Sequence, residues 1–156
     1  MFPPDFIDAD RIGCRLEVAS KKRVLEHLGG LLASSAPNLM SEAVFDRLLE
    51  RERLGSTGLG HGIALPHARM PEVKKAVGAF VQLVDGVDFD AVDDQPVDLA
   101  FALLVPQEAT EEHLQLLAKL AAMFNNTQFC DMLREAGDQQ QILQHIRDWE
   151  ASAEIG

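Results

Sequence analysis

The spacing of hydrophobic residues predicts helices towards both ends of the chain and strands between them. Apolar side chains recur on one helical face in residues 20–32, 41–53, 111–125 and 139–149, and a short helix is predicted over 128–135. Residues 76–84 are apolar except for Gln82, and residues 99–105 are apolar throughout. Unbroken apolar runs of this length are typical of strands that helices cover on both faces. A shorter strand is predicted over 63–65, before Pro66.

The order of these elements predicts an α/β fold rather than a helical bundle, with a parallel or mixed sheet between helices. Ser20, Ser41 and Thr110 are the expected N-caps of three helices, because their hydroxyls can accept a hydrogen bond from the first turn. Residues 85–95 are acidic and rich in turn-forming residues, and the pair Asp85-Gly86 predicts a hairpin there.

Chain length and composition fit one domain over residues 1–156, since 156 residues with 47% hydrophobic and 25% charged can bury a core unaided. The net charge of −11 argues against a nucleic-acid partner and favours basic protein surfaces. Cys14 and Cys130 form no paired-cysteine motif, which fits a reducing cytoplasm. Neither a secretory signal nor a membrane span of roughly 20 apolar residues is recognisable.

The segment from Gly55 to Arg69 is the strongest candidate for a functional site. It reads Gly-Ser-Thr-Gly-Leu-Gly-His-Gly-Ile-Ala-Leu-Pro-His-Ala-Arg. Its glycines permit unusual backbone conformations, and Pro66 keeps the preceding residue extended. His67 is therefore expected at the end of a strand with its ring facing outwards. There it could act as a nucleophile, a general base or a metal ligand, or it could be a loop histidine without a role.

Arg51 stands just upstream of this segment, at the end of the helix predicted over 41–53. A cation at that position either complements the helix dipole or binds phosphate oxygens through two parallel hydrogen bonds. Arg53 and Arg69 are weaker candidates for the same phosphate-binding role.

Two other histidines are candidates. His113 lies in the first turn of the helix over 111–125, on its inward face, so it either sits at the core edge or hydrogen-bonds an anion. His61 lies between two glycines and is expected to be an exposed loop side chain. Together with His67 these residues could hold zinc with an open position, although no carboxylate stands at a recognisable ligand spacing.

The sequence from Arg51 to Ala68 resembles the active-site signature of the enzyme IIA proteins of the bacterial phosphotransferase system. The similarity is to the fructose/mannitol branch, and within it most of all to the stand-alone, nitrogen-related enzyme IIA. Its most specific part is Gly-Ile-Ala-Leu-Pro-His, residues 62–67. Looser matches extend it over nearly the whole chain, at Ser20-Lys21-Lys22 and Glu112-His113-Leu114.

For the site, this resemblance implies a phosphoryl carrier. His67 would accept a phosphoryl group on Nε2 from a small histidine phosphocarrier protein. His113 would orient the ring or hydrogen-bond the phosphoryl group, and Arg51 would stabilise the phosphate, with no metal or other cofactor. The implied fold is a single domain with a mixed, mostly parallel sheet of about five strands and helices on both faces. His61 departs from the family, where asparagine is common.

The resemblance also implies partners and a setting. The expected role is regulation of nitrogen, potassium and carbon metabolism through contacts with proteins such as potassium transporters or sensor kinases, in the cytoplasm. The alternative is the enzyme IIA component of fructose- or mannitol-type sugar transport.

Overall fold

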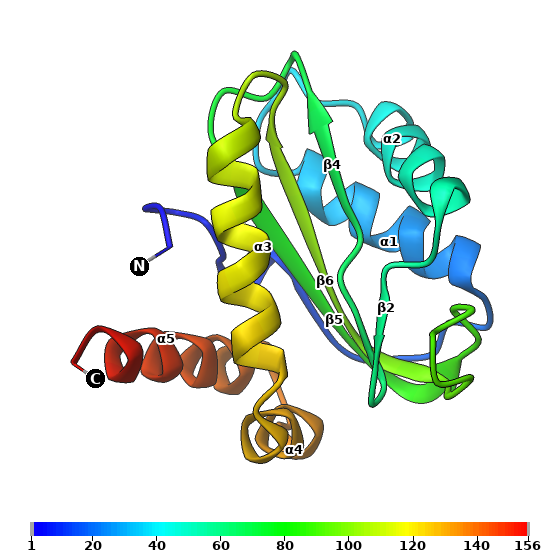
Figure 1. Ribbon diagram of the computed structural model, residues 1–156, viewed down its shortest axis with the longest axis vertical. Coiled ribbons are helices and arrows are strands. Elements are labelled where there is room, and N and C mark those ends of the chain that lie inside the picture. Colours follow the sequence, from blue (N-terminus) through cyan, green and yellow to red (C-terminus); the bar gives the residue numbers. More distant parts are fainter. Residues whose placement is uncertain (1, 156) are drawn as a thin grey trace.

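The computed structural model describes residues 2–155 and places a sheet between two layers of helices (Figure 1). A 3₁₀ turn over Ala9–Arg11 leads into the first strand. The strands are β1 (Ile12–Leu16), β2 (Gly58–Gly60), β3 (Ile63–Ala64), β4 (His67–Met70), β5 (Val77–Val87) and β6 (Val97–Pro106). The helices are α1 (Lys21–Ala33), α2 (Ser41–Leu54), α3 (Thr110–Phe124), α4 (Thr127–Glu135) and α5 (Gln139–Ile155).

The sheet is mixed, as predicted. Its strand order is β1-β5-β6-β3-β2, and β4 also pairs with β6, alongside the part of that strand beyond β3. Three pairings are parallel, namely β1 with β5, β3 with β6 and β4 with β6. The pairings of β5 with β6 and of β2 with β3 are antiparallel. β3 and β4 thus continue one another along the same neighbour, with Leu65 and Pro66 between them.

The central strand β6 supplies alternate side chains to two cores, because successive residues of a strand point to opposite faces. The larger β6 side chains face α3, α4 and α5, and mostly smaller ones face α1 and α2, which confirms helices on both faces. The first set comprises Leu99, Phe101, Leu103 and Val105, and the second Ala100, Ala102 and Leu104, all 0% exposed. Val97, at the start of the strand, also belongs to the second core but stands outside this alternation.

The hairpin predicted at Asp85-Gly86 is wrong, because both residues lie inside β5. The pairing of β5 with β6 shifts register between Gln82 and Val87, and the chain reverses only in the segment after β5. A Cβ on Gly86 would stand 2.8 Å from Cβ of Pro96. Glycine is therefore explained here by a close approach between strands, and not by a tight turn.

Helix starts match the prediction only in part. Ser20 caps α1 as predicted, since its hydroxyl accepts from the Arg23 amide at 3.2 Å. Ser41 and Thr110 are instead the first helical residues of α2 and α3, and neither helix has a side-chain cap hydrogen bond.

Candidate functional site

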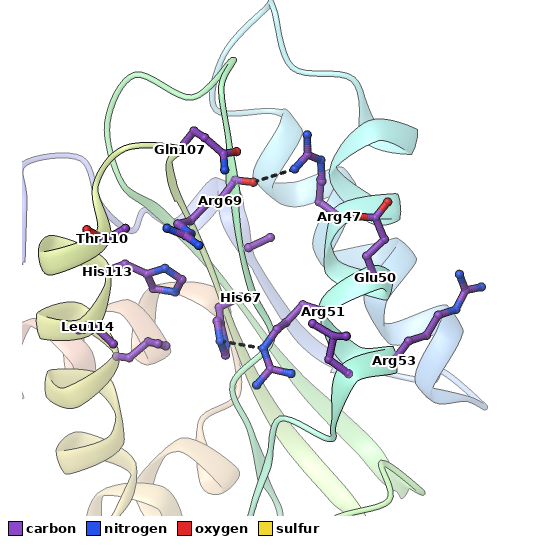
Figure 2. Close-up of a pocket in the computed structure, with 13 residues that line it drawn as sticks. Arg47, Glu50, Arg51, Arg53, His67, Arg69, Gln107, Thr110, His113 and Leu114 are labelled. Carbon is purple, nitrogen blue, oxygen red and sulfur yellow. Dashed lines mark hydrogen bonds between the residues drawn. The ribbon is translucent and has the colours of Figure 1, made fainter.

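An open cavity of about 800 Å³ lies between α2 and α3, across strand β4 (Figure 2). β4 pairs with β6 on one side, and α2 packs against it. Ala68 and Met70 belong to the core under α1 and α2, so the alternate residues His67 and Arg69 project into the cavity. The sequence predicted His67 at a strand end. It is in fact the first residue of β4, directly after the break at Pro66.

The hydrogen bonds of the His67 ring assign its two nitrogens. Nδ1 lies 2.8 Å from the main-chain oxygen of Leu65. A carbonyl oxygen only accepts, so Nδ1 carries the hydrogen, and a neutral ring then has its lone pair on Nε2. Arg51 Nε donates to that nitrogen at 3.2 Å. The exposed-side nitrogen of His67 is therefore unprotonated and lies beside a guanidinium.

Burial lowers the pKa of His67 from its ordinary value of 6.5. The hydrogen bond to Leu65 opposes this shift, whereas the positive charge of Arg51 adds to it. The ring is therefore neutral at pH 7, which is the form in which Nε2 can act as a nucleophile.

Arg51 lies in the last turn of α2, where its Nη1 donates to the main-chain oxygen of Gly55 at 2.9 Å. Among the salt bridges of residues 2–155, none includes Arg51. Its guanidinium is thus held beside His67 by neutral partners, and it retains its full charge for an incoming anion.

His113 reaches the same place from α3. Its ring lies edge-on to that of His67, with centroids 5.2 Å apart and planes at 75°. Its Nε2 is buried and has no hydrogen-bond partner among the described residues. Burial first, and then the charges of His67, Arg69 and Arg51, lower the pKa of His113 to about 4. The predicted trio of Arg51, His67 and His113 is therefore together in space, with both imidazoles neutral at pH 7.

A buried carboxylate that the sequence reasoning missed holds the glycine-rich segment in place. Glu52 is 5% exposed and accepts from the amide of Thr57 at 2.9 Å and from its hydroxyl at 2.6 Å. Lys21 Nζ lies 2.9 Å from the same carboxylate. The signal was present in the sequence, because Glu52 continues at four-residue spacing the buried stripe of Val44 and Leu48.

The backbone conformation at His61 explains why histidine can occupy this position. It stands at φ +57°, followed by Gly62 at φ +84°, in the two-residue connection between β2 and β3. A turn with two positive φ values favours Asn-Gly, and histidine is also enriched at such positions. Asp93 Oδ2 accepts from the His61 amide at 2.9 Å, and Arg134 Nη2 donates to its carbonyl at 2.8 Å. The side chain is exposed, as predicted.

The three histidines considered for zinc do not come together. His61 lines a separate, smaller cleft with Leu59 and Ile63, away from the cavity that holds His67 and His113. Throughout the described part of the chain, no group of three His, Cys, Asp or Glu residues is placed to hold a metal ion. Within residues 2–155, none of the helices has the length and hydropathy needed to cross a bilayer.

Arg53 and Arg69 differ in how they meet the cavity. Arg53 is exposed, and its side chain extends away from His67, whereas Arg69 is half-buried and directed towards Thr110 and His113 (Figure 2). Arg47, which the sequence reasoning did not consider, also lines the cavity.

The chain is similar in sequence to known proteins of one family. Residues 5–149 match the family described as phosphoenolpyruvate-dependent sugar phosphotransferase system, EIIA 2. The chain is 46% identical over 129 residues to a nitrogen regulatory protein of Pseudomonas aeruginosa, covering 83% of this chain and 84% of that protein. It is 38% identical over 124 residues to a fructose-specific EIIA component of Haloferax volcanii, covering 80% of each.

The fold is likewise shared with a solved structure. The crystal structure of nitrogen regulatory protein IIA-Ntr from Neisseria meningitidis superposes with a TM-score of 0.85 at 42% identity, covering 90% of this chain and 95% of that one.

Proposed function

The chain belongs to the EIIA 2 family of the phosphoenolpyruvate-dependent sugar phosphotransferase system, and on that premise we propose that it carries a phosphoryl group on Nε2 of His67. The observation that carries the proposal is the pair of hydrogen bonds on this ring. Leu65 holds the hydrogen on Nδ1, so the lone pair of Nε2 faces the cavity beside Arg51.

The reaction is an in-line displacement at phosphorus. The lone pair of His67 Nε2 attacks the phosphorus of a donor phosphohistidine, the donor's P–N bond breaks, and the donor imidazole retains the electron pair. His67 becomes an N-phosphorylated imidazolium whose Nδ1–H still donates to Leu65. Positioning and charge stabilisation account for most of the catalysis in such transfers, so no metal or other cofactor is required of the acceptor.

Arg51 and His113 then serve the phosphoryl oxygens. The Arg51 guanidinium exchanges its hydrogen bond to Nε2 for charge-assisted bonds to two of those oxygens. His113 Nε2, which is buried without a described partner, gains one when a phosphoryl oxygen occupies the space between the two rings. Because the pKa of His113 is lowered to about 4 in the unphosphorylated protein, its ring is neutral at pH 7 when the phosphoryl group arrives. The negative charge of the bound phosphoryl group then acts to raise that pKa.

The proposed donor is a small histidine phosphocarrier protein, and the proposed output is regulatory contact with other proteins. The similarity to the nitrogen regulatory protein of Pseudomonas aeruginosa supports a regulator of nitrogen metabolism, and we extend the proposed role to potassium and carbon metabolism. A dianion added at His67 changes the local charge and so the partner that can dock. The similarity to a fructose-specific EIIA component supports the alternative, a component of sugar transport. We place either activity in the cytoplasm, where Cys14 and Cys130 stay reduced.

Phosphorylation is tested with phosphoenolpyruvate, the general phosphotransfer enzyme and a histidine phosphocarrier protein. We expect one acid-labile phosphoryl group per chain by mass spectrometry, and none on His67→Ala. Labelling of His67→Ala to the wild-type level would refute the assignment. For the regulatory role, the partners captured by wild-type protein in its phosphorylated form are compared with those captured by His67→Ala, and identical sets would contradict a phosphorylation switch.

A further inference from the structure

Arg47 and Arg69 place a second pair of cations in the cavity that holds Arg51 and His67. On α2, Arg47 precedes Arg51 by four residues, so both lie on one helix face about 6 Å apart along the axis. On β4, Arg69 follows His67 by two residues, so its side chain leaves the same face about 6.6 Å further on. Because these two spacings are nearly equal, α2 and β4 can contact each other at two levels, one at Arg51 and His67 and the other at Arg47 and Arg69.

The contacts between helix and strand follow this match. Arg51 Nε donates to His67 Nε2 at 3.2 Å, and Arg47 Nη1 donates to the main-chain oxygen of Arg69 at 3.5 Å (Figure 2). The helix therefore runs antiparallel to the strand. Arg51 thus contacts the ring of His67, whereas Arg47 contacts the main chain at Arg69, whose guanidinium is directed towards Thr110 and His113 (Figure 2).

No salt bridge neutralises this second pair in the described residues, although the exposed Glu50 also lines the cavity. The chain has 25 Asp and Glu against 14 Lys and Arg, yet neither Arg47 nor Arg69 takes part in a salt bridge within residues 2–155. Both are half-buried, and a partly desolvated guanidinium attracts an anion more strongly than an exposed one. One phosphoryl group beside His67 already has Arg51 and His113, so the second pair is available to another anion.

We propose that Arg47 and Arg69 form a second anion-binding subsite, which receives a carboxylate side chain of the protein that donates the phosphoryl group. This inference rests on the proposed function, because it takes the donor to be a protein docked over His67. The rim of the cavity favours a protein-borne anion over a free one. Leu54 on α2 and Leu114 on α3 are 85% and 69% exposed at its two walls. A docked protein buries both leucines, whereas a small anion buries neither.

The subsite affects how the donor binds and not how the phosphoryl group transfers. Charged pairs at such positions accelerate encounter and select partners, and their effect weakens as salt increases. A donor with a carboxylate roughly 6–7 Å from its phosphohistidine along the direction of β4 is favoured over one without it.

The test is the single-turnover rate of transfer from a phosphorylated histidine phosphocarrier protein, measured against donor concentration at low and high salt. We expect Arg47→Ala and Arg69→Ala to raise the half-saturating donor concentration about threefold to tenfold at low salt, with the maximal rate within about twofold of wild type. The matched control is Arg53→Ala, which removes the same charge from the same helix but from a side chain directed away from His67. It should leave both values unchanged, and thermal melting should show all three variants folded.

A double-mutant cycle completes the test, in which each carboxylate near the donor's histidine is replaced by its amide, one at a time. One of these replacements should abolish the difference in half-saturating donor concentration between wild type and Arg47→Ala. Unchanged half-saturation in both variants, or an equal change in Arg53→Ala, would overturn the subsite. The subsite would also be overturned if inorganic phosphate removed the difference between wild type and Arg47→Ala while none of the donor's carboxylates affected it. The two arginines would then bind a free anion. Failure of wild type to accept any phosphoryl group would instead refute the proposed function.

Discussion

Replacing Glu52 by alanine is expected to destabilise the protein strongly, because the carboxylate is a buried junction between three segments of the chain. Its side chain is 2% exposed. It joins Lys21 at the start of α1 to the end of α2, and through two hydrogen bonds to Thr57 it fixes the turn that precedes β2. The same turn supplies the Gly55 oxygen that positions Arg51. The variant therefore perturbs both stability and the site.

The expected cost follows from these contacts. Removing one member of a buried ion pair costs about 3–5 kcal/mol. Lys21 is 21% exposed and has Asp90 Oδ2 at 3.5 Å as a second acidic partner, so its charge is partly compensated after the change. We place the loss near the lower end, at about 3 kcal/mol. For a domain of this length, that corresponds to a drop in Tm of about 6–12 °C.

Urea denaturation and thermal melting of Glu52→Ala measure this loss directly. The matched control is Glu50→Ala, an exposed glutamate on the same helix, whose unfolding free energy should change by less than about 0.5 kcal/mol. Replacing both charges, in Lys21→Met with Glu52→Leu, should cost less than Glu52→Ala alone, because no unpaired charge is left buried. A loss below about 1 kcal/mol in Glu52→Ala, or strict additivity in the double variant, would refute the reasoning.

Two further predictions concern the effect of pH and the turn at His61 between β2 and β3. The pKa of His67 is lowered and that of His113 is about 4, so the folded protein binds fewer protons than the unfolded chain, whose histidines titrate near 6.5. The free energy of unfolding should therefore fall as pH drops from 6.5 towards 4. The rate of His67 phosphorylation should stay constant between pH 8 and about pH 6.5, because the ring remains neutral over that range. A rate that already falls between pH 8 and pH 7 would contradict this. In the turn between β2 and β3, His61→Asn should leave Tm unchanged or raise it, whereas His61→Val should cost about 1–2 kcal/mol of stability at φ +57°. Equal Tm values for the two His61 variants would contradict the turn assignment.

The helices and the two long strands could be predicted because each buries a continuous apolar face. The prediction for residues 20–32 holds despite Gly29-Gly30, and the structure shows why. A Cβ on Gly29 would lie 3.1 Å from the Phe45 amide nitrogen, so glycine lets α1 and α2 approach closely. The short strands gave weaker signals. β4 has only Ala68 and Met70 as apolar residues on its buried face, and its other two residues point into the cavity.

The identity of the main site residues could be predicted from residue type and order in the sequence. The detailed geometry of the site could not, because it depends on tertiary contacts. Arg51, His67 and His113 were singled out from sequence, and the structure brings them together; their roles in phosphoryl transfer stay predictions. The tautomer of His67 could not be derived from spacing, because it depends on where the Leu65 carbonyl points. The pairing of Arg47 with Arg69 likewise depends on the antiparallel packing of α2 on β4, which strand order alone does not reveal.

The most direct test of the central claim is the identity of the phosphorylated nitrogen. The protein is labelled with ¹⁵N in its histidine rings, phosphorylated through a histidine phosphocarrier protein, and examined by NMR for coupling between ³¹P and the ring nitrogens. Our account predicts coupling to Nε2 of His67 alone, with Nδ1 of the same ring protonated and hydrogen-bonded to Leu65. Coupling to Nδ1 of His67 or to a nitrogen of His113, or the absence of any phosphohistidine, would contradict it.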